Sequence, residues 1–270
     1  MLGRAIAGHV PPLGLSTLRW LLPSLMLLPF AWPHLRRDWP QIAAHWRILL
    51  FLSVVGGALF GALQYVGLQY TTALNVSVLN SLAPVFIVGM AALVFGDRIR
   101  PIQGFGIATS FAGVLVIVTR LDLSALATLR FNVGDLIIVF NMLCWAVYSV
   151  FLRRRPKIHW LSFLVVFGAG STVVLLPFAV WEQAGGYPFQ PTLLTAGAIF
   201  YVATLPSVVA FAAWSRGSDL IGSNRAGPFL HLVPLYSAVL AWLVLGERLM
   251  AYHVLGFALI LAGVWFAARK

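Results

Sequence analysis

Charged side chains that could bind an ion or a charged solute are few in this sequence of 270 residues. Arg19 is the one basic residue well inside a long apolar run, and it could hold a carboxylate through two parallel hydrogen bonds. Alternatively, its side chain could reach the lipid headgroups, because it lies about 9 Å of helical rise beyond Leu13. The seven acidic residues all fall between apolar runs or at their edges. The sequence therefore disfavours coupling through a carboxylate at membrane depth, and we expect Asp97 and Glu247 to cap or pair at helix ends.

His231 is the only histidine near the middle of an apolar run. It could titrate near neutral pH and contribute to binding, or it could bond a backbone carbonyl that Pro234 leaves free. Uncharged polar and aromatic side chains complete the predicted binding set, and they suit a neutral or zwitterionic solute. Together with Arg19 and His231, the predicted substrate-binding residues are Gln64, Asn80, Asn141, Trp145, Tyr148 and Trp214.

Motifs of catalysis are not visible in the sequence. It contains no HExxH, no Gly-x-Ser-x-Gly and no phosphate loop with a lysine. The single cysteine, Cys144, excludes an intrachain disulfide and has no partner cysteine for a metal. We expect no catalytic residue, no metal and no cofactor, and hence no enzyme, although an enzyme within the membrane stays open as an alternative.

The elements that must position these side chains are long apolar helices. The chain is 61% hydrophobic and 9% charged, too apolar for a soluble domain, so we expect an all-α integral membrane protein. Lipid requires backbone amides to bond within the segment, which favours helices. The nine predicted spans are 13–33, 48–69, 74–95, 102–119, 133–152, 160–181, 192–214, 226–245 and 252–268.

Lys and Arg are distributed unequally between the two sides of these spans. The net charge of +11 arises between apolar runs, and no basic patch is interleaved with stacking aromatics, so we expect no nucleic-acid partner. The four basic residues on one side are Arg4, Arg120, Arg130 and Arg248, whereas thirteen lie on the other side. The richer side predicts a cytoplasmic C-terminus.

A phrase of fifteen residues occurs twice at an offset of 150. PVFIVGMAALVFGDR at 84–98 and PLYSAVLAWLVLGER at 234–248 are identical at six positions, and Gly106 and Gly113 match Gly256 and Gly263. Five predicted spans, an odd number, separate the loops that follow the two copies, so the copies run in opposite directions and we expect two inverted repeats of the kind found in secondary transporters. Pro84 and Pro234 open the copies and are predicted hinges, because each frees a carbonyl and permits a kink.

The repeat predicts one more helix than the nine spans supply. Span 133–152 has no counterpart, because the offset places its partner before Met1. We therefore expect two five-helix repeats in a ten-helix architecture, with the first helix missing or truncated. The alternative is a natural nine-span variant. The expected repeats are residues 1–120 and 121–270, which form one transmembrane domain.

Several stretches resemble the drug/metabolite transporter superfamily in its EamA group. GLQYTTALNVSVLNSLAPVF and VFGDRIRPIQGFGIATSFAGVLVI are similar to the family's fourth and fifth helices, and AGPFLHLVPLYSAVLAWLVLGERLMAYHVLGFALILAGVWF to its ninth and tenth. VPPLGLSTLRW is similar to the start of the second helix, and LCWAVYSVFLRR to the sixth. The resemblance implies two inverted halves around a central cavity, and export of amino acids or other small metabolites.

These observations predict an exporter in a bacterial inner membrane. We expect it to work by alternating access as a uniporter or weakly coupled carrier, as a monomer or homodimer in the lipid bilayer. Its expected substrate is an amino acid or a similarly sized metabolite. A passive channel or facilitator is the main alternative.

Overall fold

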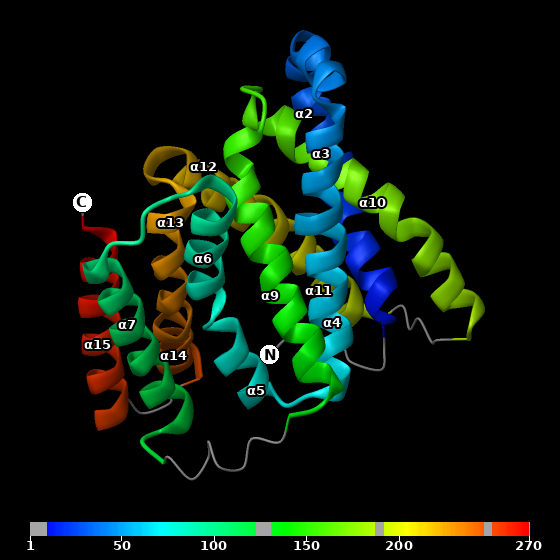
Figure 1. Ribbon diagram of the computed structural model, residues 1–270. Helices are drawn as coiled ribbons and strands as arrows, with labels where there is room; N and C mark the ends of the chain where they lie inside the picture. The colour runs from blue at the N-terminus through cyan, green and yellow to red at the C-terminus, as the bar shows by residue number, and fades with distance from the viewer. Residues whose placement is uncertain (1–9, 123–130, 187–191, 246–249, 270) are drawn as a thin grey trace. The chain divides into compact units, whose positions relative to one another are not determined.

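The computed structural model describes residues 10–122, 131–186, 192–245 and 250–269, and these residues are almost entirely helical (Figure 1). Eight helical segments among them are long and apolar enough to cross a membrane. They are Pro12–Ala44, Trp46–Tyr70, Leu74–Phe95, Pro101–Thr119, Val133–Arg154, Trp160–Ala184, Leu193–Ile221 and Ala251–Ala268. Each one overlaps a span predicted from the sequence.

The ninth predicted span, 226–245, is built from shorter pieces. Helix α13 (Ser223–Ala226) is followed by the 3₁₀ turn η4 (Gly227–His231) and by α14 (Leu232–Leu245). The first span is longer than predicted, because α2 (Pro12–Ala44) continues through Pro23, Pro29, Pro33 and Pro40. The first basic loop is therefore mostly helical.

The chain forms two compact units, and each unit combines two separate stretches of the sequence. The first comprises residues 1–69 and 147–216, and the second comprises 70–146 and 217–270. Each unit therefore contains segments from both halves of the chain. Helix α9 (Val133–Phe151) contributes to both units.

Helices α2 and α10 (Trp160–Ala184) pack side by side in the first unit, and a carboxylate from each helix caps the start of the other. Near the end of α2, Asp38 accepts hydrogen bonds from His159 N and Ser162 Oγ, each at 2.8 Å. Near the end of α10, Glu182 accepts hydrogen bonds from the backbone N–H groups of Leu13 and Gly14, each at 2.9 Å. The two helices are therefore antiparallel. Each carboxylate also lies where a helix N-terminus favours negative charge.

Replacing Glu182 by Gln should lower the stability of the first unit by about 1–2 kcal/mol, because a neutral amide oxygen is a weaker acceptor for the two partly buried N–H groups. Helix α2 begins after Pro11 and has no side-chain cap of its own. The measurement is the melting temperature in detergent, with Gln183→Ala on the adjacent exposed position as the control. Equal melting temperatures for the two variants would show that the cap contributes nothing.

The rest of the first unit contains α3 (Trp46–Leu52), α4 (Phe60–Tyr70) up to Gln69, α11 (Leu193–Thr204), and α12 (Ala210–Ile221) up to Arg216. Two π-helical turns interrupt its spans. The turn η1 (Ser53–Leu59) joins α3 to α4, and η3 (Leu205–Val209), which contains Pro206, joins α11 to α12. Such turns often occur at functional sites because they redirect side chains and leave backbone groups free.

In the second unit, α7 (Pro101–Thr119) and α15 (Ala251–Ala268) lie side by side along their length (Figure 1). A Cβ on Gly106 would lie 2.6 Å from Gly263 O, and one on Gly113 would lie 2.7 Å from Gly256 O. Contacts this short require glycine, because the two backbones touch. The numbering ascends along one helix and descends along the other, so the pair is antiparallel.

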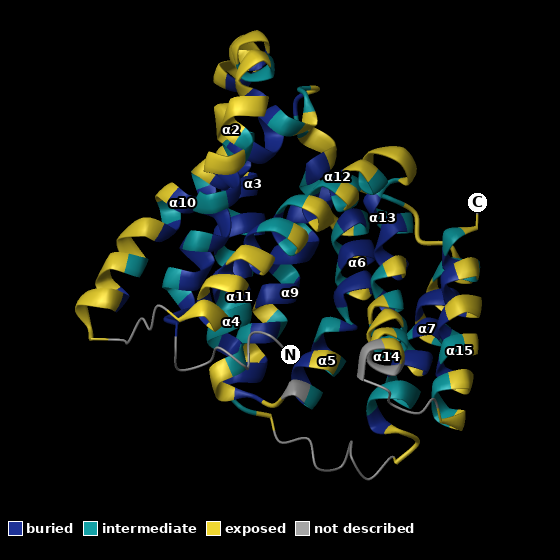
Figure 2. Ribbon diagram, turned by 180° about the vertical axis from the view of Figure 1, so that it is seen from behind, coloured by how far each residue is buried: buried dark blue, intermediate teal, exposed yellow. Residues whose placement is uncertain are grey.

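The 150-residue offset of the repeat relates these two glycine contacts to each other. Gly106 corresponds to Gly256 and Gly113 to Gly263, so the contact of Gly106 with Gly263 becomes the contact of Gly256 with Gly113. The α7–α15 interface therefore has local two-fold symmetry. In Figure 2, α15 is buried on one side and exposed on the other, as expected for a helix that packs against protein along one face.

The second unit also contains α5 (Ala73–Asn80) and α6 (Ala83–Phe95). A two-residue turn, Ser81–Leu82, separates the two helices, and Pro84 lies in the first turn of α6. At the other end of α6, Gly96 adopts a left-handed conformation with φ of 68°, which ends the helix. Asp97 follows and accepts a 2.6 Å hydrogen bond from Asn224 Nδ2, so it joins the end of α6 to α13. Glu247, the counterpart of Asp97, lies outside the described residues.

Candidate functional site

Arg19 lies on α2 about 10 Å of helical rise after its start, and its side chain is 7% exposed. Its Nε donates to Ser207 Oγ at 2.9 Å, and Ser207 in turn donates to Val202 O at 2.8 Å. The guanidinium carbon lies 5.5 Å from the ring centre of Trp20 and 5.8 Å from that of Phe211. The side chain is therefore held inside the first unit, which argues against its reaching the lipid headgroups.

Within the described part of the chain, the contacts of the Arg19 guanidinium are with Ser207, Trp20 and Phe211, and none of these is a carboxylate. A buried cation normally has an anionic partner, because removal from water costs several kcal/mol. The planar group also presents its Nη donors in a fork that matches a carboxylate. The local chemistry therefore favours an anionic ligand group.

Ser16 lies one helical turn before Arg19 on the same face of α2. Its side chain is fully buried, and its Oγ has no hydrogen-bond partner among the described residues. A Cβ on Gly61 of α4 would lie 3.8 Å from Arg19 Nη1 and 3.9 Å from Ser16 Oγ. Gly61 therefore leaves a methyl-sized space beside both polar groups. An unbonded buried hydroxyl usually costs about 1–3 kcal/mol, which suggests that a ligand bonds it.

Buried aromatic rings form one side of this site. Trp20 packs edge-on against Phe167 and Phe211, with ring centres at 4.9 Å and 4.8 Å. Trp20 Nε1 donates to Gly57 O in the π-helical turn η1 at 3.0 Å. Tyr148 of α9 joins the cluster, 5.4 Å from Phe167 and 5.7 Å from Phe211. The cluster fixes the α2 face that carries Ser16 and Arg19.

The structure brings together only some of the residues predicted to bind substrate. Arg19, Tyr148 and Trp214 belong to the first unit, where Trp214 Nε1 donates to Ser149 Oγ at 3.2 Å. Gln64 is also in this unit, half-buried on α4. The second unit holds Asn80, Asn141, Trp145 and His231. Asn141, Trp145 and Tyr148 are all buried on α9, as expected for one shared helix face. Their contact with a substrate stays a prediction.

The predicted hinge residues lie at the beginnings of helices. Pro84 is in the first turn of α6, and Pro234 is the third residue of α14. Each follows a break in its span, at Ser81–Leu82 and at η4. A proline in the first turn of a helix is well tolerated, because its missing N–H has no partner there in any case. Movement at these positions remains a prediction.

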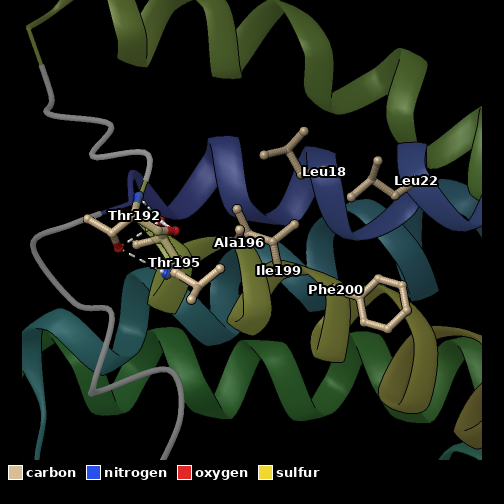
Figure 3. A pocket seen from close by; sticks show the side chains of 8 residues that line it. Leu18, Leu22, Thr192, Thr195, Ala196, Ile199 and Phe200 are labelled. Atoms are coloured by element: carbon tan, nitrogen blue, oxygen red, sulfur yellow. Dashed lines mark hydrogen bonds between the residues drawn. The ribbon is translucent and has the colours of Figure 1, made fainter.

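A separate apolar pocket of about 610 Å³ lies between α2 and α11 in the first unit (Figure 3). Among the described residues that line it, the polar ones are Thr192 and Thr195, which bond each other and cap α11. The predicted site residues do not line it, so it suits hydrocarbon better than a polar solute. The lining residues are Leu18, Leu22, Thr192, Leu193, Thr195, Ala196, Ile199 and Phe200.

The buried acidic residues hold helices together. Besides Asp38 and Glu182, Asp135 at the start of α9 accepts hydrogen bonds from Thr71 Oγ1 at 2.5 Å and Asn75 Nδ2 at 3.0 Å.

Between α2 and α10, the ring of His159 stacks on His34 at 3.7 Å. Burial, and then the nearby His34 and Arg37, lower the pKa of His159. A neutral imidazole can accept the Leu161 N–H at 3.3 Å and cap α10.

Ser16 was absent from the residues predicted to bind substrate. The signal that could have found it is its position three residues before Arg19, which places both side chains on one helix face. Ser207 is 188 residues from Arg19 in the sequence, and only its place directly after Pro206 distinguishes it. No local pattern pairs these two residues, because packing of distant segments creates the contact.

The helices define a multi-pass integral membrane protein. The model of the EamA-like transporter family matches residues 1–119 and 132–269, so the chain belongs to this family and consists of two EamA repeats. The resemblance seen in the sequence is therefore confirmed.

Relatives of the chain are named transporters. An uncharacterized transporter of Archaeoglobus fulgidus is 30% identical over 97% of this chain and 89% of its own length. An uncharacterized transporter of Bacillus subtilis is 29% identical over 81% and 72%. A protein of Streptantibioticus cattleyicolor named "Probable terminal-alkyne amino-acid exporter" is 27% identical over 95% and 84%. A crystal structure of a protein with 20% sequence identity shares the fold, with a TM-score of 0.73 over 98% of this chain and 90% of that chain.

Proposed function

We propose that this EamA-family transporter exports amino acids, or metabolites of similar size, that carry a carboxylate. The observation that carries the proposal is the buried Arg19 guanidinium, which has no carboxylate among its contacts in the described residues and lies beside the unbonded hydroxyl of Ser16. A substrate carboxylate would accept from Arg19 and Ser16 and would remove both local energetic penalties. The name of the Streptantibioticus relative supports the same class of solute.

The proposed mechanism is alternating access by two inverted repeats, 1–120 and 121–270, within a ten-helix architecture. Support comes from the family match to both halves of the chain and from the two-fold α7–α15 contact. In such carriers the substrate site lies near the midplane, where discontinuous helices meet. The excess of basic residues on one side supports a cytoplasmic C-terminus in a bacterial inner membrane. Transport itself requires no chemical step in the protein.

Exchange across proteoliposomes tests this proposal. The purified protein is reconstituted, loaded with one unlabelled amino acid at a time, and offered the same amino acid in labelled form outside. A carrier should show uptake that is several-fold faster when the lumen contains substrate, because the loaded site returns faster than the empty one. Uptake that does not depend on the internal amino acid would indicate a channel, and a chemically altered product would indicate an enzyme. Either result would contradict the proposal.

A further inference from the structure

His231 ends the turn η4 in the second unit, and its side chain is 1% exposed. Both ring nitrogens have partners: Nε2 lies 2.7 Å from Ser81 O, and Nδ1 lies 2.5 Å from Ser110 Oγ. A carbonyl oxygen can only accept, so Nε2 carries a hydrogen and donates it to Ser81. In the neutral ring, Nδ1 therefore accepts from the Ser110 hydroxyl.

Ser110 has a second acceptor within reach, because its Oγ lies 3.0 Å from Ile107 O. When Nδ1 gains a proton, its new N–H can donate to Ser110 Oγ, and the Ser110 hydrogen can turn to Ile107 O. All donors then keep acceptors, and no heavy atom has to move. The local geometry therefore accommodates both the neutral imidazole and the imidazolium.

The His231–Ser81 bond lies where the two halves of the repeat correspond. Ser81 and His231 are 150 residues apart, which is the offset of the repeat. Each lies at the break in its own span, directly before the helix that contains Pro84 or Pro234. Discontinuous helices of this kind form the ion and substrate sites of many secondary transporters. The His231–Ser81 bond therefore joins the two corresponding breaks, and only one of the two equivalent side chains is titratable.

The elements packed against η4 carry four titratable or charged side chains in the described residues. Helices α6 and α7 contain no titratable residue. On the other neighbours, α13 carries Arg225, α14 carries Tyr236, and α15 carries Tyr252 and His253. The side chain of Tyr236 is mostly exposed, and His253 Nδ1 accepts from Met250 N, directly before its own helix. Within the described residues, the His231 ring bonds Ser81 and Ser110, and its centre lies 6.5 Å from that of the Phe111 ring.

We propose that His231 is the proton-binding site that couples this transporter to a pH gradient. In each cycle, Nδ1 takes one proton from one side of the membrane and releases it on the other side in exchange for one substrate molecule. Only the N–H bond forms and breaks, and Ser110 reverses its hydrogen bond at each step. This inference rests on the proposed carrier function for its substrate, but the proton site itself can be tested without a substrate.

The transport experiment uses proteoliposomes and labelled L-phenylalanine. The lumen is at about pH 6 and the bath at about pH 7.5, so the two values lie on either side of the ordinary pKa of an imidazole. One proton per substrate can sustain up to about 30-fold accumulation over this gradient. The wild type should accumulate phenylalanine over this gradient, whereas His231→Gln should lose the gradient-driven accumulation. Ser110→Ala should reduce accumulation, because it removes the acceptor for the charged ring. His45→Gln, an exposed histidine, is the matched control and should behave as the wild type.

Two transport results would overturn the coupling site while the carrier function stands: full accumulation by His231→Gln, or exchange by the wild type that ignores the gradient. If phenylalanine does not exchange at all, the fault lies with the proposed substrate class. Nuclear magnetic resonance of ¹⁵N-histidine in lipid nanodiscs then decides the proton site directly. The signal that is lost in His231→Gln should change from neutral to charged between about pH 8 and about pH 5. A signal that stays neutral over this range overturns the proposal.

Discussion

Arg19→Gln is expected to weaken binding of an amino acid by at least about 30-fold, because loss of one partner of a buried, hydrogen-bonded charge pair costs about 2–5 kcal/mol. The groups that remain around the carboxylate in Arg19→Gln cannot replace the arginine. Ser16 Oγ can still donate one hydrogen bond, but it carries no charge. The rings of Trp20 and Phe211 offer a carboxylate no donor toward the vacated position, because Trp20 Nε1 is already bonded to Gly57 O. The dissociation constant can be measured by microscale thermophoresis in detergent.

Two further variants separate charge from geometry at this site. Arg19→Lys keeps the charge but loses the planar fork, so it should recover part of the affinity only. Arg47→Gln removes an exposed arginine from the same unit and should bind as the wild type does. Unfolding of each variant is monitored by its melting temperature. If Arg19→Gln is folded and binds as tightly as Arg47→Gln, Arg19 does not hold the substrate.

Gly106→Ala is expected to destabilise the second unit by about 3 kcal/mol or more, at the upper end of the cost of overpacking. The added methyl group would meet Gly263 O at 2.6 Å and the backbone nitrogen of Ala267, neither of which can rotate away as a side chain could. Gly263→Ala should cost a similar amount, because its methyl group would meet Gly106 O at 2.5 Å. The effect is measured as the melting temperature and as the yield of monodisperse protein.

The double variant gives the sharper result. Once one methyl group has moved α7 away from α15, the second methyl group has more room. The double variant should therefore lose less stability than the sum of the losses of the two single variants. Gly104→Ala is the matched control on α7: a Cβ there has no atom within 4 Å, and alanine favours the helix by up to about 1 kcal/mol. Equal stability of Gly104→Ala and Gly106→Ala would contradict the close helix contact.

Much of the fold could be predicted because membrane helices leave strong local signals. The apolar runs located eight segments that the structure shows as long helices, and Gly106, Gly113, Gly256 and Gly263 marked the repeat that the family match also finds. The breaks could be placed only in part. Pro84 and Pro234 indicated irregular backbone, but whether each kinks a helix or begins a new one depends on the residues before it. The ten-helix inverted architecture stays a prediction.

The candidate site was harder to predict, because its contacts join distant segments. Arg19 stood out as a lone cation in an apolar run, but its bond to Ser207 depends on the π-helical turn η3, which no local pattern indicates. Glu182 was expected at the edge of a span, whereas Asp38 was expected between spans and lies inside α2, which continues to Ala44. Their reciprocal capping follows only from the antiparallel packing of α2 and α10. His231 bonds a backbone carbonyl, but it is the carbonyl of Ser81 in the first half of the chain and not one that Pro234 leaves free in its own span.

The central claim is that the Arg19 guanidinium recognises a substrate carboxylate, and a comparison of two ligands tests it most directly. L-phenylalanine and L-phenylalaninamide differ only where a carboxylate is replaced by a neutral amide. The wild type should bind the acid at least about tenfold more tightly than the amide, since a charged hydrogen bond contributes about 1.5–3 kcal/mol, and Arg19→Gln should lose this preference. Equal binding of the two ligands by the wild type, or an undiminished preference in Arg19→Gln, would contradict the account.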